Sequence, residues 1–248
     1  MVQTVLNLSA YVQPAPRHVL LSANRLARRR IRRTHHPGLQ PRELALRHAA
    51  RIFAMRIVTL SGSLRAASTN SALLEACQLL APPGVELRPF RGVGALPHFN
   101  PDVEATDLPV TVAAFRDEIT QADGLLISSP EYARGIPGAL KNALDWLVGH
   151  PPFAGKPVTV FNASPRSVHA TAQLLEVLTT MSAHIVREAL ITLPLLGTGL
   201  AAAEIAVDPK LSGPARQALA AFVSAISSTK SMTVPGGRQG VVGESPTR

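Results

Sequence analysis

The sequence predicts an α/β fold, namely a doubly wound, five-stranded parallel sheet with helices on both faces. From residue 55 onward, short apolar runs alternate with longer amphipathic segments over short links, which is the pattern of parallel strands joined by crossover helices. The run 124–128, GLLIS, shows no apolar–polar alternation, as expected for a strand covered on both faces. At 248 residues the chain is long enough to bury a substantial core.

The first half of the domain starts with a strand over 57–60, where the run IVTL is apolar and rich in β-branched residues. A hydroxyl-rich turn then leads into a helix over 70–80, which ends at the turn sequence APPG. Residues 85–90 predict the second strand. The Pro- and Gly-rich connection 91–109 is long, which is typical of a loop near a functional site.

The second half repeats the alternation. A helix is expected over 110–122 and another over 139–148, after the Pro- and Gly-containing turn that follows the strand 124–128. Lys141 and Asp145 are spaced to pair across one turn of that second helix. The remaining elements are expected to be strands over 157–161 and 185–190 and helices over 170–181 and 209–227.

The two ends of the chain are expected to lie outside the domain, which takes up residues 55–229. Residues 1–54 hold ten arginines and one acid, so they carry the whole net charge of +9. Blocks of like charge are typical of disordered tails, although Met55, just before the first strand, also suits a misassigned upstream start, and a targeting or nucleic-acid role stays open. The tail 230–248 is expected to be disordered.

Several classes of site are excluded by composition. A single cysteine, Cys77, rules out an internal disulfide and a cysteine-based metal cluster, and its apolar helical surroundings predict a buried, unreactive thiol. The eight histidines show no metal-ligand spacing. No apolar run is long enough to span a bilayer. We therefore expect no metal and no membrane partner.

The turn after the first strand is the main candidate for a ligand site. It presents hydroxyl, amide and guanidinium donors at the start of a helix, where backbone N–H groups are unpaired and the dipole favours an anion. The donors are Ser61, Ser63, Arg65, Ser68, Thr69 and Asn70. The P-loop and G-x-G-x-x-G patterns are absent, so the turn suits a phosphate monoester. Ser, Thr and Asn are also ordinary helix N-caps, and a turn without a ligand remains the alternative.

Three loops are expected to meet at one place. In doubly wound sheets, ligands bind outside the carboxyl ends of the strands, and the loops after the strands at 57–60, 124–128 and 157–161 are the richest in polar and turn residues. The segment 129–146, SPEYARGIPGALKNALDW, is the second informative stretch, and the polar turn at 162–166 is the third.

Together, GSLRAASTN at 62–70 and SPEYARGIPGALKNALDW at 129–146 resemble the NADPH-dependent FMN reductase family, over about residues 55–229. The resemblance implies a flavodoxin-like fold, FMN as cofactor and NADPH or NADH as co-substrate. It also implies a cytoplasmic homodimer or homotetramer. The residues after 164, PRSVH, depart from the glycine-rich run of many members, which leaves the contacts of this loop open.

Site residues follow from the same resemblance. It places Ser63, Arg65, Ser68 and Asn70 on the ribityl phosphate. It places two further groups beside the flavin ring: Pro130, Glu131, Tyr132 and Ala133, and Asn162, Ala163 and Ser164. No protein side chain is expected to be catalytic, because the chemistry takes place at N5 of the flavin. An alternative role for Glu131 is an ion pair between subunits. For Arg134 two roles stay open: attraction of the NADPH phosphates, or simple exposure to solvent.

The resemblance therefore implies an NAD(P)H oxidoreductase that passes hydride through FMN to a small-molecule acceptor, such as a quinone, an azo compound, free flavin or a metal oxyanion such as chromate. The alternative is a flavodoxin-like electron carrier without nicotinamide turnover. Flavodoxins are usually strongly acidic, whereas residues 55–248 are neutral, which favours the reductase. A nucleic-acid partner would depend on the arginine-rich leader alone and is not expected.

Overall fold

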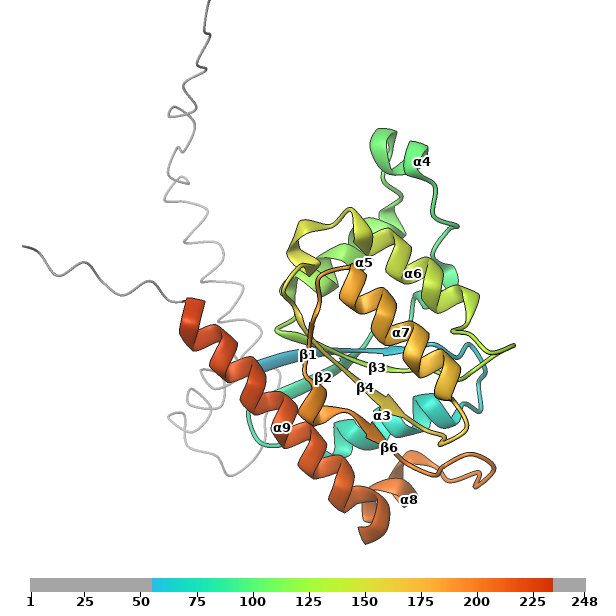
Figure 1. Cartoon of the computed structure of the whole chain (residues 1–248), viewed down its shortest axis with the longest axis vertical. Helices are drawn as coiled ribbons and strands as arrows, with labels where there is room; N and C mark the ends of the chain where they lie inside the picture. The colour runs from blue at the N-terminus through green and yellow to red at the C-terminus, as the bar shows by residue number, and fades with distance from the viewer. Residues whose placement is uncertain (1–54, 234–248) are drawn as a thin grey trace, which may run out of the picture. The chain divides into compact units, whose positions relative to one another are not determined.

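A computed structural model describes residues 55–233, and these contain a parallel sheet whose strands follow the order β2-β1-β3-β4-β5, with β6 also paired to β4 (Figure 1). This order places β1 and β3 side by side in the middle of the sheet, as in doubly wound flavodoxin-type folds. The α/β prediction is confirmed. The strands are β1 (Met55–Ser61), β2 (Val85–Pro89), β3 (Gly124–Ser128), β4 (Pro157–Asn162), β5 (His184–Ile185) and β6 (Ile191–Thr192).

Helices cover both faces of the sheet, as Figure 1 shows. One face packs on α3 (Thr69–Leu80), α8 (Ala202–Val207) and α9 (Pro209–Thr233). The other packs on α5 (Val110–Gln121), α6 (Gly138–Val148) and α7 (Val168–Thr180). Neighbouring strand residues alternate between the two cores, for example Ile57 in one and Val58 in the other. Both faces of the central strands are therefore apolar and buried, which explains the continuous apolar run of β3.

The connection 91–109 has more local structure than a loop, since it contains the 3₁₀ helix η1 (Val93–Ala95) and the short helix α4 (Pro101–Thr106). Asn100 caps α4 by accepting a hydrogen bond from the Asp102 backbone N–H. The connection is fixed to α6 at Trp146, which is fully buried and whose indole N–H donates to the Pro97 carbonyl at 2.8 Å. The Lys141–Asp145 pair also forms, at 2.5 Å.

The predicted fifth strand over 185–190 is wrong as a single element. Two short strands, β5 and β6, pair with successive parts of β4, and the 3₁₀ helix η3 (Arg187–Ala189) separates them. Val186 and Ala189 turn into the core beside α9. Arg187 and Glu188 between them are exposed, so half of the run 185–190 lies in a helical turn instead of the sheet.

The C-terminal part of the domain also differs from the prediction. Helix α8 was not predicted, and α9 continues to Thr233, beyond residue 229 where the sequence analysis ended the domain. The start of the expected disordered tail is therefore wrong. The leader 1–54 and residues 234–248 lie outside the described residues. Within 55–233, no helix is long and apolar enough to cross a bilayer.

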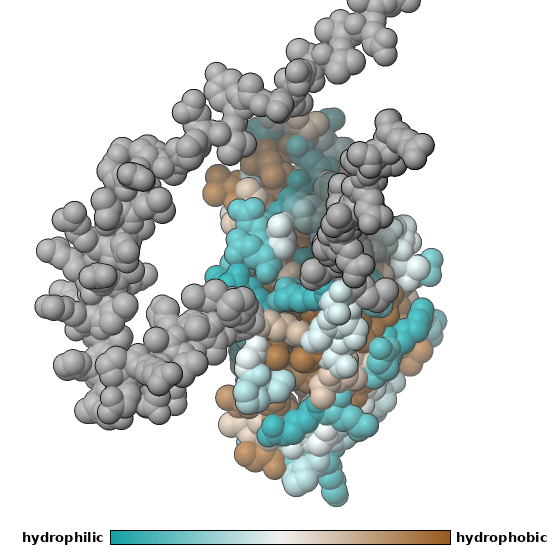
Figure 2. All heavy atoms as spheres, turned by 90° about the vertical axis from the view of Figure 1, so that its left-hand side faces the viewer, coloured by the Kyte–Doolittle hydropathy of each residue, from teal (hydrophilic) through white to brown (hydrophobic). Residues whose placement is uncertain are grey.

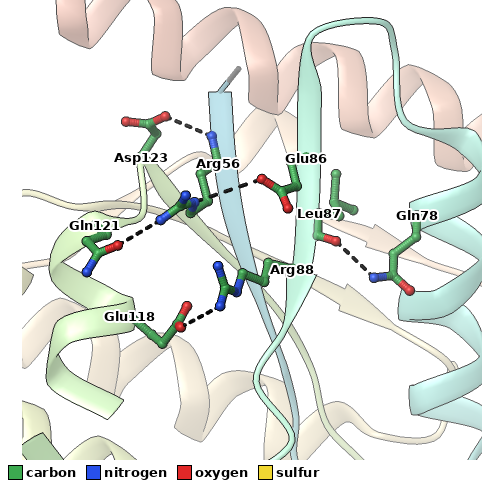
Figure 3. Close-up of polar contacts among 8 residues, drawn as sticks. All are labelled: Arg56, Gln78, Glu86, Leu87, Arg88, Glu118, Gln121 and Asp123. Atoms are coloured by element: carbon green, nitrogen blue, oxygen red, sulfur yellow. Dashed lines mark hydrogen bonds and ion pairs between the residues drawn. The ribbon is translucent and has the colours of Figure 1, made fainter. Parts of the chain in front are cut away.

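The edge of the sheet where the strands begin is held by polar contacts (Figure 3). The Arg56 backbone N–H donates to Asp123 Oδ2 at 2.8 Å, and the Arg56 guanidinium donates to Gln121 Oε1 at 2.9 Å. Farther along β2, Arg88 pairs with Glu118 at 2.9 Å. Figure 2 views the molecule from this side and shows hydrophilic and hydrophobic residues interspersed over the described surface. The charged groups drawn in Figure 3 are paired with one another.

Thr159 in β4 is fully buried, and its hydroxyl has no hydrogen-bond partner among the described residues. A buried hydroxyl without a partner is destabilising, so Thr159→Val is expected to raise the free energy of unfolding by about 1 kcal/mol. Urea denaturation measures this. Thr171→Val is the matched control, because the Thr171 hydroxyl donates to the Ser167 carbonyl at 2.6 Å and its loss should destabilise. If Thr159→Val were less stable than the wild type, the Thr159 hydroxyl would have a hydrogen-bond partner after all.

Cys77 is fully buried in α3, and burial raises the pKa of its thiol to about 12. We expect native protein at about pH 8 to resist thiol alkylation, since the thiolate is the reactive form, and to react only after unfolding. Because the thiol pKa is higher in the folded state than in the unfolded state, keeping Cys77 protonated stabilises the folded protein. This stabilisation is fully present below the pKa of the unfolded thiol and is lost as pH rises toward 12. Rapid alkylation of Cys77 in the native protein would contradict this and would show that the thiol becomes accessible to solvent.

Candidate functional site

The carboxyl ends of β1 and β3 bring the first two candidate loops together. Ser61 and Ser128 are opposite each other in the parallel register, and the Gly62 N–H donates to the Ser128 carbonyl at 2.8 Å. A Cβ added to Gly62 would lie 2.6 Å from Ser129 Oγ. The loops after β1 and β3 are therefore in contact at Gly62, where a side chain larger than that of glycine does not fit. The loops after β1, β3 and β4 lie on the right of Figure 1, as predicted for this edge.

Hydroxyl groups of the first loop bond mainly to the loop itself. Ser61 Oγ lies 3.0 Å from Ser71 Oγ and 3.3 Å from the Ser63 N–H. Ser68 is the N-cap of α3 and accepts from the Ser71 N–H at 3.2 Å, so the cap alternative is confirmed for this residue. Asn70 is buried and accepts from Ser128 Oγ at 2.9 Å through its Oδ1. These bonds give the turn a fixed shape before any ligand is present.

The remaining donors of this loop are free for an anion. Thr69 and Asn70 begin α3, so their backbone N–H groups have no acceptor within the helix. Arg65 is exposed and has no ion-pair or hydrogen-bond partner for its guanidinium among the described residues. First-turn amides and one unpaired guanidinium fit a phosphate monoester.

A hollow adjoins the first loop on the side of β2. It has a volume of about 260 Å³, and Ser61, Ser63 and Arg65 of the loop line it together with Phe90 and Arg91 from the end of β2. The hollow reaches neither the loop after β3 nor the loop after β4. It is therefore an extension of the predicted phosphate region and not the predicted flavin region.

The loop after β3 forms a tight hairpin. Tyr132 and Gly135 exchange two backbone hydrogen bonds of 3.0 Å. Ala133 and Arg134 between them have φ values of 48° and 62°. This is the left-handed conformation that a type I′ two-residue hairpin requires at both central positions and that asparagine and glycine adopt most easily. Tyr132 is 49% exposed, so an aromatic face remains available for stacking.

Glu131 caps a helix. Its Oε2 accepts from the Ala170 N–H at 2.9 Å, in the first turn of α7. The N-cap residue of α7, Ser167, makes no side-chain cap, so the carboxylate of Glu131 replaces it, and the helix dipole favours the negative charge there. The sequence did not indicate this role. The loops after β3 and β4 are thereby joined.

The loop after β4 is buried and folded on itself. Asn162 Oδ1 accepts from the Ser164 N–H at 3.0 Å, and Ser164 Oγ accepts from the Arg166 N–H at 3.1 Å. The Leu195 N–H donates to the Ala163 carbonyl at 3.1 Å. The acceptor oxygens of Asn162 and Ser164 therefore shape the turn.

The structure thus brings all three predicted groups of residues to one edge of the sheet. Three polar side chains that sequence reasoning did not single out also take part: Ser71, Ser128 and Gln173. In the sequence, only Ser128 could have been singled out, because it ends a buried strand, as Ser61 ends the neighbouring one. Gln173 lies in mid-helix and gave no such signal.

Residues 55–194 match the model of the NADPH-dependent FMN reductase family. The chain is 41% identical over 112 residues to an NAD(P)H-dependent FMN reductase of Pseudomonas aeruginosa, an alignment that covers 44% of this chain and 60% of that protein. It is 40% identical over 113 residues to a quinone reductase of Escherichia coli, with the same 44% and 60% coverage. The chain thus spans about 60% of the length of these relatives.

Among solved structures, the chain resembles FerB of Paracoccus denitrificans, a flavoenzyme NAD(P)H:(acceptor) oxidoreductase. The two superpose with a TM-score of 0.59 at 29% identity, over 71% of this chain and 98% of that one. The likeness covers the whole FerB chain, so the sheet and its helices are shared.

Proposed function

Since the chain belongs to the NADPH-dependent FMN reductase family, we propose that it is an FMN-dependent oxidoreductase that takes hydride from NAD(P)H and passes electrons to a small-molecule acceptor of the quinone type. When bound, the flavin supplies the redox chemistry. The single observation that carries the proposal is the first loop, where an unpaired guanidinium and first-turn amides form a site for a phosphate monoester. Quinone reduction is the named activity of the Escherichia coli relative, which supports the choice of acceptor.

Each loop has a distinct role in the proposal. Arg65 and the backbone N–H groups of Thr69 and Asn70 hold the flavin phosphate, while the side chains of Ser61, Ser63 and Ser68 keep the turn in shape. The backbone of residues 130–133 and 162–164 borders the isoalloxazine ring. Tyr132, half exposed at the hairpin, forms a wall of the pocket. No side chain acts as acid or base.

Two parts of the proposal follow from family resemblance rather than from contacts within the described chain. We propose a homodimer or homotetramer with the flavin near the subunit boundary, and a cytoplasmic location. Of the eight large apolar side chains that are exposed within residues 55–233, half lie in segments that follow a strand end, which supports a boundary at this edge: Leu64, Tyr132, Val168 and Leu196.

The test is direct. Purified protein should bind FMN, seen as flavin absorbance after desalting, and should then oxidise NADPH in the presence of benzoquinone. FMN binding without NADPH oxidation would indicate the flavodoxin-like electron carrier instead. Protein that stays colourless after incubation with FMN would refute both.

A further inference from the structure

The Tyr132–Gly135 hairpin is fastened to α7 by two side chains that reach in opposite directions. Glu131, just before the hairpin, accepts from the Ala170 N–H at 2.9 Å. Gln173 of α7 accepts through Oε1 from the Ile136 N–H, just after the hairpin, at 2.8 Å. Both ends of the hairpin are thus tied to the first two turns of one helix. The hairpin and the start of α7 form a joined unit with a fixed relative position.

This joined unit carries positive charge without a partner. Arg134 lies at the tip of the hairpin and Arg166 just before α7, and both are exposed. Neither guanidinium makes an ion pair or a hydrogen bond within residues 55–233. The one acid in the two loops, Glu131, already accepts from Ala170. The unit therefore presents two free guanidinium groups to solvent at the edge where the predicted ligands bind.

Arg134 is held by the hairpin in a conformation that costs a non-glycine residue free energy. Its φ of 62° belongs to the left-handed region, where glycine is preferred. No hydrogen bond or ion pair of its side chain within the described chain offsets this. Strained residues cluster at ligand sites, and the exposed guanidinium of Arg134 is available to a group outside the protein.

We propose that Arg134 and Arg166 form an anion subsite that binds the phosphate groups of the incoming pyridine nucleotide, and that Glu131 and Gln173 are positioning residues that hold Arg134 in place. The inference rests on the proposed function, which makes NAD(P)H the electron donor. Guanidinium groups bind phosphate oxygens in pairs of parallel hydrogen bonds. Arg65, which lies on a different loop, binds the flavin phosphate. The flavin and the pyridine nucleotide are therefore bound by different arginines.

The test uses FMN-loaded Arg134→Gln, Arg166→Gln and the double variant. We expect each single change to raise KM for NADPH by about tenfold, with kcat altered less than about twofold, because the lost contacts bind the ground state and the transition state equally. The effect should shrink at about 0.5 M salt. Arg216→Gln is the matched control, since Arg216 is exposed on α9 and unpaired within the described residues, and its KM should stay at the wild-type value.

Direct binding provides a second measurement. Calorimetric titration with adenosine 2′,5′-bisphosphate should give an affinity about tenfold weaker for each variant than for the wild type if the arginines bind the 2′-phosphate. In that case KM for NADH is unaffected. A rise in KM for both nucleotides, with adenosine diphosphate binding weakened in place of the bisphosphate, places the contact on the pyrophosphate. Either result supports the subsite and identifies which phosphate it binds.

The positioning role has its own signature. Glu131→Ala should raise KM for NADPH in the wild-type background but add little to Arg134→Gln, since residues that act as a unit are not additive. Glu131→Gln keeps an acceptor oxygen and should restore most of the affinity. The proposal is overturned if the arginine variants match Arg216→Gln in KM and in binding of both adenosine nucleotides while the wild type oxidises NADPH. Absence of NADPH oxidation by the wild type refutes the proposed function instead, and the titrations still test the subsite.

Discussion

Replacing Arg65 with glutamine is expected to weaken FMN binding by roughly 10- to 100-fold and to leave riboflavin binding unchanged. A charge-assisted hydrogen bond is worth about 1.5–3 kcal/mol, and riboflavin lacks the phosphate that would accept it. Arg65 is exposed and its side chain has no partner within the described chain, so the free energy of unfolding should change by less than about 0.5 kcal/mol.

Quenching of flavin fluorescence during titration measures both affinities. Arg65→Lys, which keeps the charge and loses the planar fork, should fall between the wild type and Arg65→Gln. Arg216→Gln is again the control for an exposed arginine elsewhere. Equal losses for FMN and riboflavin would show that Arg65 shapes the loop, and unchanged FMN affinity would show that the phosphate lies elsewhere.

Much of the fold was predictable because local and tertiary preferences agree. The apolar run of β1, the hydroxyl-rich turn and the start of α3 lie within a few residues of their predicted places. Ser68 is an N-cap both by residue type and in the structure. The meeting of the three loops followed from strand order alone, because the carboxyl ends of parallel strands share one edge.

Other features depend on contacts between distant residues and left no local signal. The run 185–190 holds two apolar pairs around Arg187 and Glu188, and this composition does not distinguish a strand from the 3₁₀ turn that separates β5 and β6. The cap on α7 comes from Glu131, 39 residues before Ala170. Arg65, Arg134 and Arg166 were visible in the sequence, but only the structure shows that no acid among the described residues pairs with them.

Changing Gly62 to alanine is expected to destabilise the protein by about 1–3 kcal/mol and to weaken FMN binding as well. The new Cβ would lie 2.6 Å from Ser129 Oγ, 3.0 Å from Ser129 Cβ and 3.1 Å from Leu140 Cδ2. Ser129 and Leu140 are buried, so neither side chain moves freely, and overpacking of this size costs that much. The loops after β1 and β3 must separate, which displaces the phosphate site from the flavin region. Urea denaturation and FMN titration measure the two effects.

A second change should reverse the first. Ser129→Gly removes both of the closest atoms, and the Ser129 hydroxyl contributes only a 3.1 Å bond to its neighbour Pro130, so the double variant Gly62→Ala, Ser129→Gly is expected to recover most of the stability and the FMN affinity. Gly138→Ala is the matched control, because a Cβ there meets no atom within 4 Å and alanine favours the helix it begins. If Gly62→Ala were as stable as Gly138→Ala, the two loops would not be in the close contact that joins the phosphate region to the flavin region.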